Sequence, residues 1–133
     1  MSDIVIRKSG SIGRITLNRP DALNALTLEM VKAISAALPG WAADDDIAMI
    51  VIEGAGEKAF CAGGDIADIY AALAKDDPSV ARAFWRAEYR MNAALFTFPK
   101  PVASFLQGFT MVLLVCHSVL VRPFLLMSVV PLT

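Results

Sequence analysis

Short apolar runs alternate with amphipathic stretches along most of this chain. A β-hairpin is predicted around the turn at residues 9–11, flanked by Ile4, Ile6, Ile12, Ile15 and Leu17. Residues 47–52 are apolar throughout, which is typical of a parallel strand buried on both faces. Because such strands alternate with helical patterns, the chain is predicted to adopt an α/β fold with repeated strand-helix units.

Three segments show the spacing of amphipathic helices. The first begins after Thr27, a favourable N-cap, and its apolar positions are Met30, Val31, Ile34, Leu38 and Trp41. The pair Pro39-Gly40 predicts a break near its end, which would place Trp41 in a separate turn. Two more helices are predicted over residues 66–74 and 79–96, the latter with Val80, Phe84, Met91 and Leu95 on one side.

The stretch 57–66 joins the apolar strand to the second of these helices through a short extended piece and a loop. Gly63 and Gly64 allow the backbone to approach a ligand closely, and Asp65 suits an N-cap with Asp68 as a capping-box partner. Unpaired N–H groups at such a helix start can hold an anion or a developing oxyanion. The alternative is an ordinary strand-to-helix turn.

Composition narrows the class of protein. The chain has 133 residues, enough for one domain with a modest core, and 56% of them are hydrophobic. Its formal net charge is −1 and its basic residues are scattered, so no nucleic-acid partner is expected. Cys61 and Cys116 lack a metal-binding spacing, so we expect no metal site and reduced thiols. Since the first eight residues resemble neither a secretory nor a transit segment, a cytoplasmic location is expected.

A family resemblance rests on residues 58–66, Lys-Ala-Phe-Cys-Ala-Gly-Gly-Asp-Ile. This stretch resembles the signature of the crotonase (enoyl-CoA hydratase/isomerase) superfamily, and its Gly-Gly-Asp form is similar to the 3-hydroxyisobutyryl-CoA hydrolase branch. Residues 17–20, Leu-Asn-Arg-Pro, and 24–26, Asn-Ala-Leu, resemble the elements that flank the coenzyme A pocket in that superfamily. On those residues alone, a plain strand-turn-helix connection is an equal alternative.

The resemblance implies an α/β fold that is the N-terminal part of a crotonase (ββα-repeat) fold and is incomplete. Residues 1–111 would form a truncated acyl-CoA-binding domain, and residues 112–133 a divergent apolar tail. It also implies thioester hydrolysis of 3-hydroxyisobutyryl-CoA in valine breakdown. No separate cofactor is implied, because coenzyme A is part of the acyl-CoA substrate.

The resemblance also assigns site residues. Gly64 would be a backbone oxyanion donor, and coenzyme A would lie against Ala22, Leu23, Ala62, Asp65 and Ile66. The segment 84–92 resembles an aromatic-x-Arg-x-Glu-Tyr-x-x-Asn pattern in which the Glu contacts the acyl substrate, which assigns substrate binding to Glu88. The alternative for Glu88 is a surface carboxylate paired with Arg86 or Arg90.

The resemblance stops after Met111, where the superfamily has a glycine run. This chain has Val-Leu-Leu-Val at 112–115, and Leu113 stands at the place of the second oxyanion donor. The downstream catalytic Glu and Asp of the hydrolase branch have no counterparts, so impaired activity is expected, and His117 receives no catalytic role. A family-type homo-oligomer is likewise not expected from a truncated chain.

Two other functions stay open: an enoyl-CoA hydratase or isomerase, and, from a different class, a catalytically inert fragment or interaction piece. Residues 101–121 contain no Lys, Arg, Asp or Glu, which raises the question of a membrane span. Because the first part of this window resembles a strand of the superfamily and Gln107 and Gly108 interrupt it, no span is expected.

Overall fold

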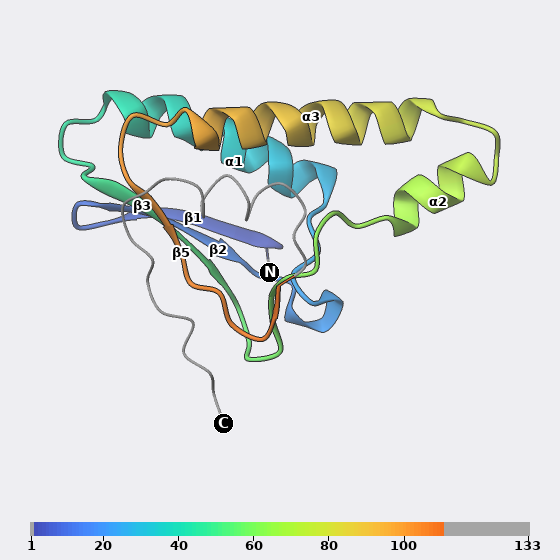
Figure 1. Cartoon of the computed structure of the whole chain (residues 1–133), viewed down its shortest axis with the longest axis horizontal. Helices are drawn as coiled ribbons and strands as arrows, with labels where there is room; N and C mark the ends of the chain where they lie inside the picture. Colours follow the sequence, from blue (N-terminus) through green and yellow to red (C-terminus); the bar gives the residue numbers. More distant parts are fainter. Residues whose placement is uncertain (1, 111–133) are drawn as a thin grey trace.

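The computed structural model describes residues 2–110, which form a four-stranded sheet carrying two long helices on one face (Figure 1). Strand β1 (Ile4–Ser9) pairs antiparallel with β2 (Ile12–Leu17) across the predicted hairpin turn. Strand β3 (Met49–Gly54) runs parallel to β2 on one side and to β5 (Val102–Ser104) on the other. The strand order is β1-β2-β3-β5, so the predicted α/β class is confirmed.

A second, two-stranded pairing lies at the end of this sheet. Strand β4 (Ala59–Cys61) runs parallel to β6 (Phe109–Thr110), with Cys61 opposite Thr110. All three residues of β4 are buried, so this short strand fixes the loop that follows it.

The helices cover one face of the large sheet. A 3₁₀ turn, η1 (Pro20–Ala22), precedes α1 (Leu28–Ala43). The short α2 (Ala67–Leu73) contacts α3 (Ser79–Phe96), and α3 lies beside α1 (Figure 1). Thr27 is the N-cap of α1, as predicted, with its hydroxyl accepting a 3.2 Å hydrogen bond from the Met30 N–H. The bounds of α3 match the prediction.

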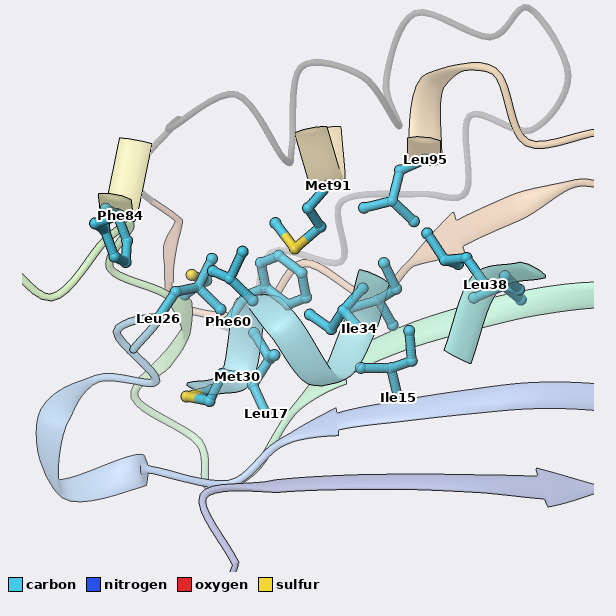
Figure 2. Packing of buried hydrophobic residues seen from close by; sticks show 14 of the residues in the cluster. Ile15, Leu17, Leu26, Met30, Ile34, Leu38, Phe60, Phe84, Met91 and Leu95 are labelled. Atoms are coloured by element: carbon cyan, nitrogen blue, oxygen red, sulfur yellow. The ribbon is translucent and has the colours of Figure 1, made fainter. Parts of the chain in front are cut away.

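The core lies between the helices and the sheet, and Phe60 is at its centre. In Figure 2, Phe84, Met91 and Leu95 of α3 point toward Phe60, Leu26 and the side chains of α1. Phe84, Met91 and Leu95 are buried, in keeping with the predicted one-sided pattern of α3, whereas Val80 is 36% exposed. Val80 is in the first turn of α3, before the helix reaches α1.

The break predicted at Pro39-Gly40 is wrong, since α1 continues through both residues to Ala43. Pro39 lacks the N–H that would bond back one turn, but it is exposed and tertiary contacts hold the last turn in place. Trp41 covers Gly13 of β2, where an added Cβ would lie 2.6 Å from the indole ring. The Lys100 ammonium donates to the carbonyls of Trp41 and Asp44, which satisfies the helix end.

The start of α2 also differs from the prediction. The helix begins at Ala67 with Ile66 as N-cap, and the capping box of Asp65 and Asp68 does not form. Asp65 instead accepts a 3.0 Å hydrogen bond from the Ala67 N–H at its Oδ1, two residues on. Asp65 therefore still orders this turn, but from one position before the cap.

No helix within residues 2–110 is long and apolar enough to cross a membrane. The predicted tail 112–133 with Leu113, Cys116 and His117, and most of the uncharged window 101–121, lie outside the described residues. The division of the chain after residue 111 stays a prediction.

Candidate functional site

Two loops that are far apart in the sequence lie against each other at the end of the sheet. The carbonyl of Leu23 accepts a 2.9 Å hydrogen bond from the Ala62 N–H. Leu26 then donates to the Gly63 carbonyl at 2.8 Å and accepts from the Asp65 N–H at 2.7 Å. The candidate coenzyme A residues Ala22, Leu23, Ala62, Asp65 and Ile66 are thereby brought into one place, which we call the paired loops (residues 19–26 and 61–66).

The fully buried side chain of Asn24 fixes the first of the paired loops. Its Oδ1 accepts from the Arg19 N–H, and its Nδ2 donates to the carbonyls of Ala55 and Ala59, each at 2.9 Å. Asn24 and Leu23 both have positive φ, 55° and 53°, a conformation that asparagine tolerates better than most residues. This asparagine therefore ties the loop to the ends of β3 and β4.

Gly64 differs from its neighbours in its backbone hydrogen bonding. The N–H groups of Ala62, Gly63 and Asp65 all donate, to the Leu23 carbonyl, the Cys61 sulfur and the Leu26 carbonyl respectively. The Gly64 N–H has no acceptor among the described residues. A Cβ at this position would lie 2.8 Å from the Phe84 ring and 3.9 Å from Oε1 of Glu88, so only glycine fits without a shift.

Glu88 of α3 lies beside Gly64 and is 1% exposed. Its Oε1 has no hydrogen-bond partner, and the ion pairs of residues 2–110 do not include it, so the surface pairing with Arg86 or Arg90 is not found. Burial disfavours the charged form and raises the pKa of this carboxyl. Burial likewise raises the pKa of the Cys61 thiol, with the nearby Glu88 charge acting in the same direction.

Asp65 has the opposite electrostatic setting. Its hydrogen bond from the Ala67 N–H and its contact with Arg19, 3.0 Å between Oδ2 and Nη1, lower the pKa of the carboxyl. Arg19 also donates to the carbonyl of Ala25 at 2.8 Å, so this ion pair joins the two loops. The neighbouring Ile66 is 70% exposed and presents an apolar side chain at the edge of the paired loops.

The two carboxyls predict opposite dependences of stability on pH. Because the pKa of Glu88 is raised in the folded protein, its contribution to folding stability is complete at pH values below its pKa in the unfolded chain. That stability is lost as the pH rises through its pKa in the folded protein. Because the pKa of Asp65 is lowered in the folded protein, its contribution to folding stability is present at pH values above its pKa in the unfolded chain. That stability is lost as the pH falls through its pKa in the folded protein. Urea unfolding measures this. Between about pH 4 and pH 7, the free energy of unfolding of Glu88→Gln should rise relative to wild type, and that of Asp65→Asn should fall relative to wild type. Parallel trends in the two variants would contradict these environments.

Three residues of the site were not assigned from the sequence. Asn24 and Arg19 lie within the two short matching elements but were given no role, because the sequence does not reveal which partners a side chain meets. Asn92 ends the matching segment 84–92 and is 4% exposed. The sequence feature that could have identified Asn92 as a site residue is its position one helical turn after Glu88.

The described residues do not form a metal-binding group at this site. Within residues 2–110, no three His, Cys, Asp or Glu side chains are placed to hold a metal ion. A hollow of about 420 Å³ lies elsewhere, between the N-terminal strand and the start of α1, lined by residues that include Asp3, Thr27 and Met30. It contains none of the candidate residues, so we place the site at the paired loops and Glu88, where buried polar groups converge.

Comparison with known proteins gives consistent matches over the described part of the chain. The sequence model of the enoyl-CoA hydratase/isomerase family matches residues 12–112. The proteins named 3-hydroxyisobutyryl-CoA hydrolase, mitochondrial, from Danio rerio and Homo sapiens are 46% and 45% identical over 83% and 82% of this chain. The match covers 28% of each relative, so the chain spans under a third of the length of these curated relatives.

Solved structures show the same partial coverage. A crystal structure of an enoyl-CoA hydratase from Rhodobacter sphaeroides superposes with a TM-score of 0.79 at 53% identity, covering 83% of this chain and 33% of that one. A carnitinyl-CoA dehydratase from Mycobacterium thermoresistibile gives a TM-score of 0.77 at 42% identity, covering 81% and 32%. The architecture is therefore part of the fold of these proteins.

Proposed function

The chain belongs to the enoyl-CoA hydratase/isomerase family, and from this premise we propose that it is the acyl-CoA-binding part of a thioester hydrolase acting on 3-hydroxyisobutyryl-CoA. One observation carries the proposal: the unengaged N–H of Gly64 lies beside the buried carboxyl of Glu88. The substrate is suggested by the names of the curated relatives, and it would connect the protein with valine breakdown. The cytoplasmic location and the absence of a family-type oligomer stay predictions.

The proposed chemistry uses each group in one role. The thioester carbonyl oxygen would accept a hydrogen bond from the Gly64 N–H, and the donor would become more effective as the oxygen gains negative charge during attack by water. Breaking the carbon–sulfur bond would then give the free acid and coenzyme A. Glu88, placed next to Gly64, would contact the acyl group, while Ala22, Leu23, Ala62, Asp65 and Ile66 would line the path of coenzyme A.

The 133 residues contain no match to the downstream acid and base of the hydrolase branch, and such groups typically contribute factors of about 10² to 10⁴ in rate. We therefore expect measurable binding of the thioester and hydrolysis that is slow for a family enzyme. A hydratase reaction is the second candidate, because the Rhodobacter sphaeroides structure named for that activity is 53% identical over the same region. The same Gly64 donor would then stabilise an enolate.

A titration and an assay on the purified 133-residue chain test the proposal. Saturable binding of 3-hydroxyisobutyryl-CoA, with release of free thiol above the buffer rate, is the expected result, and crotonyl-CoA serves as the hydratase substrate. Glu88→Ala should weaken binding at least about tenfold and slow the hydrolysis, as expected for removal of a buried acyl contact. The matched control is Glu57→Ala, since Glu57 is an exposed carboxylate in the loop before β4. If neither thioester binds, the chain is an inert fragment and the proposal fails.

A further inference from the structure

Two polar side chains share the buried face of α3. Glu88 and Asn92 are 1% and 4% exposed, while Met91 and Leu95 beside them pack into the hydrophobic core. The two residues are four positions apart, which places their side chains about 5–6 Å from each other on one face of the helix. We call them the polar pair of α3.

The polar pair has unmet hydrogen-bonding capacity. Oε1 of Glu88 and both Oδ1 and Nδ2 of Asn92 are closed to solvent and have no hydrogen-bond partner within residues 2–110. A buried polar group without a partner destabilises a fold, so most buried polar groups are paired. Leucine at position 92 would fit the surrounding apolar residues without this penalty, which makes asparagine there unfavourable for stability alone.

The polar pair lies where it could contact an acyl group bound at Gly64. Oε1 of Glu88 lies 3.9 Å from the point where a Gly64 side chain would begin, and Asn92 continues the polar surface one turn along α3. An acyl carbonyl bound at the Gly64 N–H would bring its α and β carbons toward this surface. A hydroxyl group both donates and accepts a hydrogen bond, and so matches an amide that offers a free N–H and a free oxygen.

We propose that Asn92 is a specificity residue that, with Glu88, binds a hydroxyl group on the acyl chain and so selects hydroxyacyl thioesters over plain hydrocarbon ones. This inference rests on the proposed function, since it assigns a substrate class to the same site. A site built to hydrogen-bond a hydroxyl disfavours the analogue that lacks it, because the buried polar groups then stay unpaired.

Equilibrium titration of the full chain with two thioesters tests the inference. 3-Hydroxyisobutyryl-CoA and isobutyryl-CoA differ only in the hydroxyl, and wild type should bind the former at least about tenfold more tightly, equivalent to one good hydrogen bond. In Asn92→Leu this ratio should fall to within about threefold, while the affinity for isobutyryl-CoA stays the same or improves. The titration is followed to equilibrium, because the three polar atoms are closed to solvent and the acyl group must displace neighbouring side chains to reach them.

A stability measurement separates specificity from structural support. Asn92→Leu should melt at the same temperature as wild type or up to about 4 °C higher, because it removes a buried unpaired amide. A clear loss of stability in this variant would mean that Asn92 supports the fold, and would overturn the inference. Equal affinities of wild type for the two thioesters would overturn it too and leave the proposed function standing. Failure of both thioesters to bind would overturn the proposed function and the inference together.

Discussion

Asn24→Ala should lower the free energy of unfolding by about 4 kcal/mol, because it removes three hydrogen bonds at a buried position. The Arg19 N–H and the carbonyls of Ala55 and Ala59 would lose their partner, and alanine tolerates the φ of 55° poorly. The loss is a large share of the stability of an ordinary domain, about 5–15 kcal/mol. Urea unfolding measures it. Binding of acyl-CoA should weaken in the same variant, because Asn24 orders the loop that carries Ala22 and Leu23.

Asn18→Ala is the matched control. Its side-chain amide makes one hydrogen bond, 2.9 Å to the Ser2 carbonyl, and that contact is exposed. The free energy of unfolding should change by no more than about 1 kcal/mol. A comparable loss in both variants would mean that asparagine removal acts through general effects on the chain and not through the buried network.

Phe60→Ala should destabilise the protein by about 3–5 kcal/mol. The ring is 0% exposed and lies between α1, α3 and the sheet, so its removal leaves a cavity that the surrounding side chains fill only in part (Figure 2). Phe60 and Cys61 are on the short strand β4, which leads directly into the loop with Gly63 and Gly64. The variant should therefore also bind acyl-CoA more weakly at temperatures where it remains folded. Chemical denaturation and thioester titration give the two readouts.

Phe105→Ala makes the same chemical change at a position that is 48% exposed. It should cost less than about 1.5 kcal/mol, since a half-exposed ring gives up only part of the transfer free energy and leaves no closed cavity. Equal losses in the two phenylalanine variants would show that the main core does not lie at Phe60.

The sequence predicted those elements whose local pattern agrees with their tertiary surroundings. The hairpin of β1 and β2, the buried strand β3 and the bounds of α3 were all readable, since each is an apolar period bounded by a turn or a proline. Pro39 was misleading because the rule that proline ends a helix uses local sequence alone. Here the last turn is held by the packing of Trp41 on Gly13 and by a hydrogen bond from Lys100, about sixty positions away. The start of α2 is one residue later than predicted, because Ile66 takes the N-cap position although the Asp65 carboxylate accepts from the Ala67 N–H.

The candidate site was predictable in part, for a related reason. The family pattern singled out Gly64 and Glu88. No property of the isolated segments indicated that Glu88 would be buried without a partner among the residues that the structure describes. Asn24 and Asn92 were not predicted as site residues, because the sequence around an asparagine does not show whether it lies in a turn, on the surface or in the core. Only the packing of α3 against the glycine loop distinguishes these cases.

The pairing of β5 with β3 has a consequence for how the protein folds. Ile50 is in register with Val102, 52 positions later in the chain, so a three-residue strand closes a long loop that contains Gly64, Glu88 and Asn92. Long-range pairing of this kind slows folding, because the entropy of closing the loop is lost before the contacts form. The site should therefore be among the last regions to become ordered, and a nascent chain would assemble it only after β5 has been synthesised.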